Sequence, residues 1–204
     1  MKSFSCTVAG DRELILEIRT PSIKEGTLYR LSAAIYSLDL DIYSGDIDTL
    51  EEEGELYSYD RFVLRTMVDG SARKLSEIGL KLGMLMEALL SDDSDPEELI
   101  RSGEKEIPRP ESFFEAGVEV LFDQNTEKGE TTMYLEAPDR PGLLFTVARL
   151  LFRHDVNIVS ATLRSTYGGH ARDLFHLQSK GKPLNPDTID ALSSFLSQFT
   201  ASDN

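Results

Sequence analysis

The feature that most constrains the fold of this chain is an internal repeat. The segment LEIRTPSIKEGTLYRLSAAIYSLDLDIYSGD aligns with the later segment MYLEAPDRPGLLFTVARLLFRHDVNIVSAT, with one added residue in the first copy and a constant offset from Leu28 onward. A second block, YDRFVLR, aligns with RDLFHLQ, and the first copy carries three extra residues between the blocks. The matched pairs include Leu28 with Leu144, Leu31 with Val147, Ile35 with Leu151, Ile42 with Ile158 and Asp60 with Asp173. Such self-similarity predicts two units of the same fold in tandem.

Each copy is predicted to contain two strands, a helix, two more strands and a second helix. In the second copy, Leu144, Val147, Ala148 and Leu151 form one apolar helix face. Alternating apolar residues predict strands around 118–122, 131–137, 156–163 and 170–178, and Asn185-Pro186 opens the last helix. The first copy gives strands near 4–9, 13–19, 40–48 and 58–68, and helices near 24–38 and 73–90. The order ββαββα predicts an α+β fold of two ferredoxin-like, two-layer sandwiches.

The segment between the copies predicts a linker. From Ser91 to Ala116 it holds nine acidic residues, three basic residues and three prolines, and Asp95-Pro96 indicates a short helix there. We therefore divide the chain into a first unit over 1–90, an acidic linker over 91–115 and a second unit over 116–204.

Composition excludes several classes of function. The net charge of -15 argues against a nucleic-acid partner, because phosphate binding needs clustered Lys and Arg. The single cysteine, Cys6, cannot form an internal disulfide. No stretch reaches about 18 apolar residues and the N-terminus lacks the apolar core of a signal peptide, so we expect a cytoplasmic protein without a membrane span.

The turn Asp139-Arg140-Pro141-Gly142 is the strongest candidate for a site. It precedes a helix, whose first amides lack partners and carry partial positive charge. Gly142 has no side chain, so a ligand carboxylate could approach these amides. We expect Asn157, at the start of the next strand, to lie beside the turn, and Asp139 to receive an ammonium group. The same residues also fit a plain helix start, since Asp and Pro suit a first helical turn.

The run APDRPGLLFTVARLLFRHDVNI resembles the ACT domain, a ligand-sensing module of amino-acid metabolism. With the extra strand before it, the second copy is most similar to the paired C-terminal ACT repeats of the bacterial nitrogen-sensing uridylyltransferase. The resemblance implies paired units with amino acids bound at their interfaces, and no cofactor. It places the ligand-site positions at Asp139, Arg140, Pro141, Gly142, Leu143, Leu144, Asn157 and Ile158.

The first copy departs from this signature. PSIKEGTL replaces PDRPGLL, and Asp41 stands where the second copy has Asn157. Because a carboxylate there would repel an incoming carboxylate, we expect the second copy to bind ligand and the first to serve mainly as a packing partner.

Sequence motifs and residue spacing give little support for a catalytic site or a metal site. No G-x-S-x-G elbow, P-loop, H-E-x-x-H or dinucleotide fingerprint is present. On a strand, His170 and His176 share one face and Asp173 lies on the other, so these three residues do not converge on a metal. We therefore predict a non-catalytic regulatory homodimer that senses an amino acid or similar metabolite and signals to a protein partner. The alternatives are a ligand-free interaction scaffold and a small enzyme on a ferredoxin-like sheet.

Overall fold

The computed structural model describes residues 3–21, 25–66, 72–91, 94–114, 118–125 and 128–197. The first half contains β1 (Ser3–Val8), β2 (Glu13–Pro21), α1 (Thr27–Ser37), β3 (Leu40–Glu52), β4 (Glu55–Thr66) and α2 (Ala72–Ser91). The second half contains β5 (Glu119–Asn125), β6 (Glu130–Pro138), α4 (Leu143–Arg153), β7 (Asn157–Arg164), β8 (His170–Gln178) and α5 (Pro186–Ser197). Both halves follow the order ββαββα, which confirms the predicted α+β fold class.

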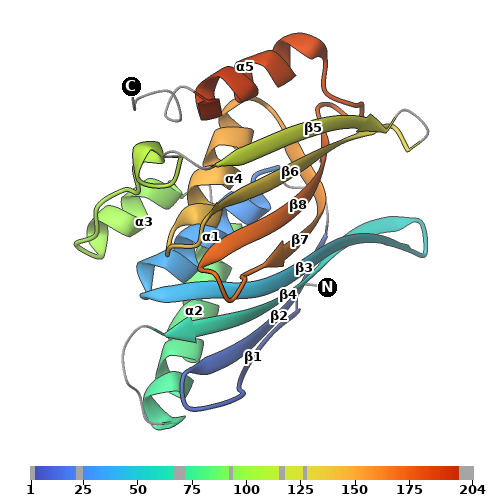
Figure 1. Cartoon of the computed structure of the whole chain (residues 1–204). Coiled ribbons are helices and arrows are strands. Elements are labelled where there is room, and N and C mark those ends of the chain that lie inside the picture. The colour runs from blue at the N-terminus through green and yellow to red at the C-terminus, as the bar shows by residue number, and fades with distance from the viewer. Residues whose placement is uncertain are drawn as a thin grey trace.

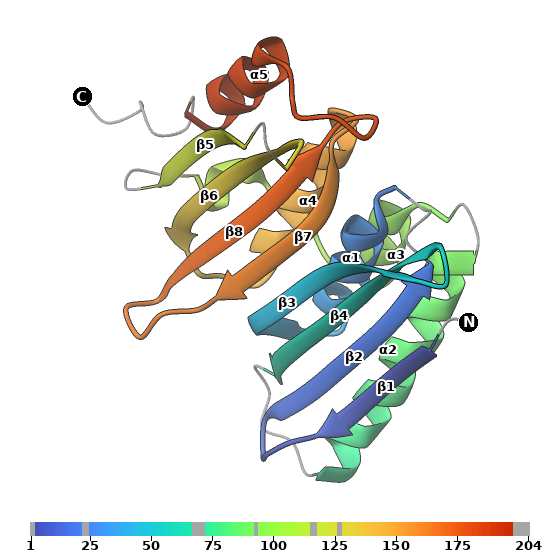
Figure 2. The same ribbon diagram turned by 90° about the vertical axis from the view of Figure 1, so that its right-hand side faces the viewer.

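The two halves share one antiparallel sheet of eight strands, in the order β1-β2-β4-β3-β7-β8-β6-β5. Each half therefore has the same strand order from its outer edge to the middle. The halves meet where β3 pairs with β7, from Ser44 opposite Arg164 to Ile47 opposite Ala161. Figures 1 and 2 show the helices on one face of this sheet, with the other face uncovered. The repeat thus folds as two units joined edge to edge.

Helices α1 and α4 pack against each other on the helix-covered face, behind the middle of the sheet in Figure 1. The Tyr29 ring lies 5.4 Å from the rings of both Phe145 and Phe152, measured between centroids. The apolar face predicted for the second-copy helix is buried, including Leu144 and Leu151. Because buried side chains of both halves form one cluster, the halves share a continuous core.

The segment predicted as a linker packs onto this core. Helix α3 (Pro96–Ser102) begins where the sequence indicates, with the Asp95 side chain accepting a hydrogen bond from the Glu97 amide. The side chains of Ile100, Phe113 and Phe114 are buried. A short 3-10 helix, η1 (Pro110–Ser112), precedes the two phenylalanines. The sequence did not predict this packing, because its apolar residues form only short pairs, Leu99-Ile100 and Phe113-Phe114, among charged residues and prolines.

Glu97 attaches α3 to the second half. Its carboxylate lies 2.8 Å from Arg101, 3.4 Å from Arg149 and 2.7 Å from Arg153. The side chains of Glu97 and Arg149 are only 12% and 11% exposed, so this contact is largely shielded from water. The described part of the segment is therefore held between α1 and α4. Across the described ranges of the chain, no helix is both long enough and apolar enough to cross a membrane.

Candidate functional site

The turn Asp139–Gly142 connects β6 to α4 and leaves helix amides free. Gly142 adopts φ 93°, in the left-handed region that favours glycine, and has no side chain to cap the helix. The Leu143 amide donates to Arg140 O at 3.1 Å. The amides of Leu144 and Phe145 donate to no other residue in the described part of the chain. The open helix end predicted from the sequence is therefore present.

A small cavity of about 30 Å³ lies at this turn, between the two halves. The second half contributes five of the predicted site residues and Asp173 of β8: Asp139, Arg140, Gly142, Leu143, Leu144 and Asp173. The first half contributes Ser32 and Tyr36 of α1 and Asp41 and Ile42 of β3. The cavity therefore needs both copies of the repeat.

Asn157 and Ile158 do not join this cavity, contrary to our expectation that Asn157 lies beside the turn. They line a second cavity of about 40 Å³, together with Gly26 and Asp60 of the first half. The reason is geometric: the 11-residue helix α4 separates Gly142 from Asn157, and 11 residues rise about 16 Å. The antiparallel pairing of β3 with β7 then places Asp41 at the Gly142 turn and Asn157 at the Gly26 turn.

The remaining predicted residue, Pro141, lies further out. It lines a surface pocket together with Pro108 and Arg109 of the segment after α3. The Arg140 guanidinium also points to this segment and donates to Ser112 O at 2.7 Å. The predicted site residues are thus divided among three places rather than gathered at one.

Each turn is covered by an aromatic ring from the other half. A Cβ atom built on Gly142 would lie 3.1 Å from Tyr36 Cε2 and 2.9 Å from Pro108 Cγ. A Cβ on Gly26, the equivalent glycine, would lie 2.7 Å from the ring of Phe152, which is the repeat equivalent of Tyr36. Lys105 contacts Tyr36 twice: its ammonium donates to the backbone Tyr36 O at 2.5 Å and lies 4.7 Å from the centroid of the Tyr36 ring. The Gly142 turn is therefore closed by close packing.

Carboxylates dominate the electrostatics of the cavity at Gly142. Burial, and then the charge of Asp139, raises the pKa of Asp41 to about 6. Burial raises the pKa of Asp173 to about 7, although the Arg164 amide donates to its Oδ1 at 3.2 Å. The Arg164 guanidinium points elsewhere, to Asp46 at 2.6 Å. The cavity therefore favours a cationic group and disfavours a second anion.

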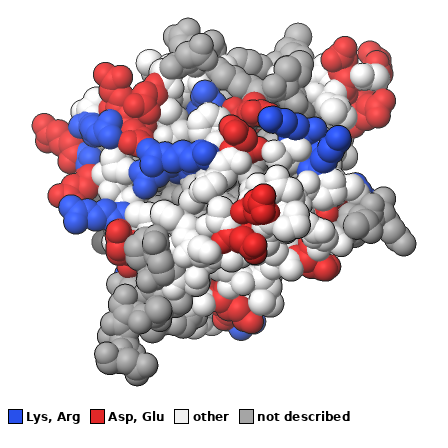
Figure 3. All heavy atoms as spheres, turned by 90° about the horizontal axis from the view of Figure 1, so that it is seen from above, with Lys and Arg blue, Asp and Glu red and all other residues white. Residues whose placement is uncertain are grey.

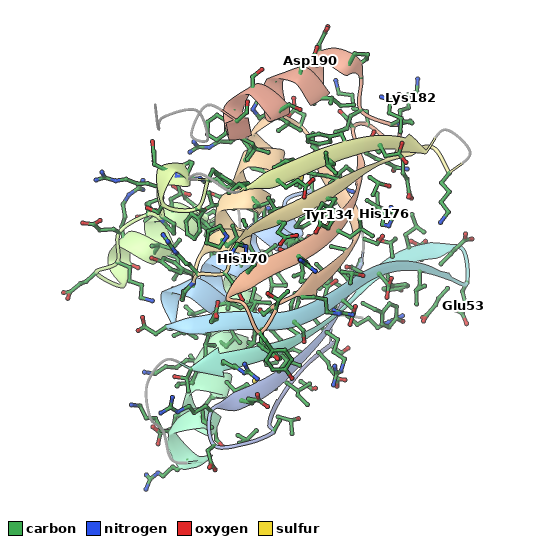
Figure 4. The ribbon with its side chains drawn as sticks, in the orientation of Figure 1. Glu53, Tyr134, His170, His176, Lys182 and Asp190 are labelled. Atoms are coloured by element: carbon green, nitrogen blue, oxygen red, sulfur yellow. The ribbon has the colours of Figure 1, made fainter. Side chains whose placement is uncertain are left out.

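The histidines of β8 lie as their spacing predicts. His170 and His176 are on the uncovered face of the sheet, and Asp173 is buried on the other side (Figure 4). His170 Nδ1 lies 4.0 Å from Glu136, and His176 Nδ1 lies 3.5 Å from Glu130. Among the residues that the structure describes, no three His, Cys, Asp or Glu side chains group to hold a metal ion.

Sequence reasoning missed the residues that the first half brings to the cavity, namely Ser32, Tyr36 and Asp41. The signal was available in the repeat, because Asp41 aligns with Asn157 and Tyr36 aligns with Phe152. When two copies are related by a near two-fold axis, a residue of one copy lies near the turn of the other copy, and its repeat equivalent does the reverse. Pro108 could not be predicted in this way, because it lies between the two copies and has no equivalent in the repeat.

The sequence of the chain is similar to known proteins. Residues 131–192 match the family model described as ACT domain. The chain is 25% identical over 137 residues to the bifunctional uridylyltransferase/uridylyl-removing enzyme of Ectopseudomonas mendocina, covering 66% of this chain and 15% of the relative. It is 28% identical over 153 residues to the enzyme of that name from Azospirillum brasilense, covering 75% of this chain and 16% of the relative. The chain thus spans about one sixth of the length of these relatives.

Among solved structures, aspartate kinase from Synechocystis matches with a TM-score of 0.46 and 13% identity. The match covers 91% of this chain and 26% of the kinase chain.

Proposed function

We propose that this chain is a non-catalytic regulatory protein of the cytoplasm, because residues 131–192 match the ACT domain family model. It senses an amino acid or a related amine-bearing metabolite of nitrogen metabolism and signals through protein contacts. The observation that carries this proposal is the cavity at the Gly142 turn, which both halves line. On the face seen in Figure 3, acidic and basic side chains are interspersed, which supports a small-molecule ligand over a nucleic acid.

The chemistry of the cavity suits a zwitterion. The carboxylates of Asp41, Asp139 and Asp173 can accept hydrogen bonds from an ammonium group. The free amides of Leu144 and Phe145 can donate to a carboxylate at the positive end of α4. An α-amino acid carries both groups, whereas a simple amine or a simple carboxylate would satisfy only one side.

Binding requires the cavity to enlarge. Its present volume of about 30 Å³ matches the share of one water molecule in the liquid. A ligand would therefore have to displace Tyr36 or Pro108 from Gly142, and so favour a wider placement of α1 relative to α4. The ligand would bind the wider placement of α1 and α4 more tightly than the closed one. Ligand binding would therefore change any surface to which both halves contribute.

Thermal melts with a panel of amino acids test this proposal. A ligand at one hundred times its dissociation constant adds about 2.7 kcal/mol of stability. For a chain of this size, that gain raises Tm by roughly 5–11 °C. Asp139→Asn should remove the shift, whereas Asp123→Asn, on the distant edge strand β5, should keep it. The absence of a shift with every amino acid at millimolar concentration would refute ligand sensing.

The close packing at Gly142 specifically favours a second candidate, a ligand-free interaction scaffold. Tyr36 and Pro108 fill the space that a ligand carboxylate would need. In this case the chain would associate with itself or with a regulated protein, and melting would not respond to amino acids. Association is common to both candidates, and we include a homodimer in the proposed function because the sheet has free edges.

A further inference from the structure

We propose that two copies of this chain associate through the outer edge of β1 and the adjoining face of α2. This inference rests on the self-association included in the proposed function, and it is independent of ligand binding. Figures 1 and 2 show β1 at one end of the sheet with α2 alongside it. Strand β1 pairs with β2 on one side, and no described strand pairs with its other side.

The surface beside β1 is a largely apolar groove of about 420 Å³, lined by residues that include Phe4, Ile18, Leu80, Met84 and Leu90, and also by Glu87. The side chains of Phe4, Leu80 and Met84 are unusually open to solvent for their type, at 39%, 69% and 65% exposure. A group of exposed hydrophobic side chains on one surface is typical of protein interaction sites.

Two helix glycines explain how β1 lies so close to α2. A Cβ on Gly83 would lie 2.8 Å from the Phe4 ring, and a Cβ on Gly79 would lie 3.0 Å from Cys6 Sγ. Glycine inside a helix costs roughly 0.5–1 kcal/mol relative to alanine, so this close approach offsets an intrinsic penalty. The consequence is one continuous surface made of a strand edge and a helix face.

The charge distribution indicates a second copy as the occupant. The chain carries a net charge of -15, so two copies associate most readily through a surface that holds few acidic residues and balances them with basic ones. Charged residues and prolines commonly protect an edge strand from pairing with another chain. Strand β1, with sequence SFSCTV, has neither. Helix α2 carries three basic and two acidic residues, so this edge is not acidic.

The opposite edge of the sheet lacks these properties. Strand β5 includes Glu119 and Asp123, which would oppose each other across a symmetric antiparallel pair centred on Leu121 and so place like charges together. Its neighbour α5 has no large hydrophobic side chain that is exposed in its described residues. Leu121 is the exposed hydrophobic residue of β5, and it provides a matched control.

The chain already uses this mode of association internally. Its halves join by antiparallel pairing of β3 with β7, together with packing of α1 against α4. Antiparallel pairing of two β1 strands would repeat that geometry and extend the same sheet. It would also bring α2 of each copy together in opposite directions, so that Arg73, near one end, faces the end with Glu87 on the partner.

The test is the mass of the chain in solution, measured by light scattering over a range of concentrations. The wild-type chain should reach twice its monomer mass of 22.8 kDa. Leu80→Glu and Met84→Glu should each weaken dimerisation at least tenfold, because each places a carboxylate from both copies in a largely apolar contact. Both residues are exposed, so the folded monomer should keep its circular dichroism spectrum and melting cooperativity. The control Leu121→Glu, on β5, should leave the dimer intact.

Three outcomes would overturn the inference in distinguishable ways. A wild-type chain that stays monomeric at high concentration would refute self-association itself, and with it that part of the proposed function. A dimer that survives Leu80→Glu and Met84→Glu would refute only the choice of surface. A dimer lost in Leu121→Glu would assign the contact to β5. Ligand sensing is unaffected by any of these results, because the melts with amino acids test it separately.

Discussion

Replacing Gly142 with alanine tests whether the strand–helix turn is closed as tightly as the geometry indicates. Two costs add. The left-handed backbone at φ 93° costs an L-residue about 1–2 kcal/mol. The new methyl group would lie 2.9 Å from Pro108 and 3.1 Å from Tyr36, and overpacking of this kind costs about 1–3 kcal/mol. We therefore expect Gly142→Ala to lower the free energy of unfolding by about 2–5 kcal/mol.

A matched control separates these costs. Gly54 adopts a similar φ of 84°, but no atom lies within 4 Å of a Cβ built on it. Gly54→Ala should therefore carry only the backbone cost of about 1–2 kcal/mol. Urea denaturation of both variants and the wild type gives the difference, provided that the slope with denaturant is unchanged.

A double-mutant cycle then assigns the packing cost. In a Tyr36→Ala background, the penalty of Gly142→Ala should fall by at least about 0.5 kcal/mol, because part of the crowding is gone. Equal penalties for Gly142→Ala and Gly54→Ala would refute the reasoning. They would mean that the turn has room for a methyl group, and hence that the ring of Tyr36 does not close it.

Three further predictions follow from the site and its surroundings. If a ligand enters the cavity at Gly142, Asp41→Asn should change the ligand-induced Tm shift and Asn157→Asp should not; the opposite result would move the site to the Gly26 turn. The raised pKa of Asp173, about 7 against an ordinary value near 4, means that the folded state holds this proton more tightly than the unfolded state. Its contribution to stability is therefore largest at acid pH and is lost as the pH rises towards 7, so Asp173→Asn should stabilise the chain at pH 8 more than at pH 4.5 in denaturant titrations. An equal effect at both pH values would contradict the raised pKa. Glu97→Gln should cost about 1.5–3 kcal/mol, because it removes the charged partner of the shielded Arg149. Glu77→Gln, which breaks the exposed pair with Arg73, should cost no more than about 0.5 kcal/mol in the same urea assay.

Much of the fold could be predicted because its signals are local. The apolar spacing of Leu144, Val147, Ala148 and Leu151 predicted α4, and the alternation from His170 to Gln178 predicted β8 with its observed ends. Strand β3 extends beyond its prediction to Glu52, because the acidic hairpin tip is paired with β4 although its side chains are exposed. The repeat itself predicted that both halves share one chain order.

The candidate site could be predicted only in part. The open helix end at Gly142 follows from local sequence, since glycine and proline determine the backbone there. The partners of that turn do not, because they depend on which strand edges meet. A single unit viewed alone suggests Asn157 as the neighbour of Gly142, whereas the whole chain brings Asp41 and Tyr36 there.

The sequence by itself therefore determined the elements, their repeated order and the conformation of the turn, all of which depend on side-chain periodicity and backbone preference within a few residues. Tertiary structure alone decided that β3 pairs with β7, that Ile100, Phe113 and Phe114 of the segment after α2 are buried, and that each turn is closed by the other half. The physical reason is that edge pairing and core burial depend on contacts between residues far apart in the chain, and no local pattern encodes which of several compatible edges will meet.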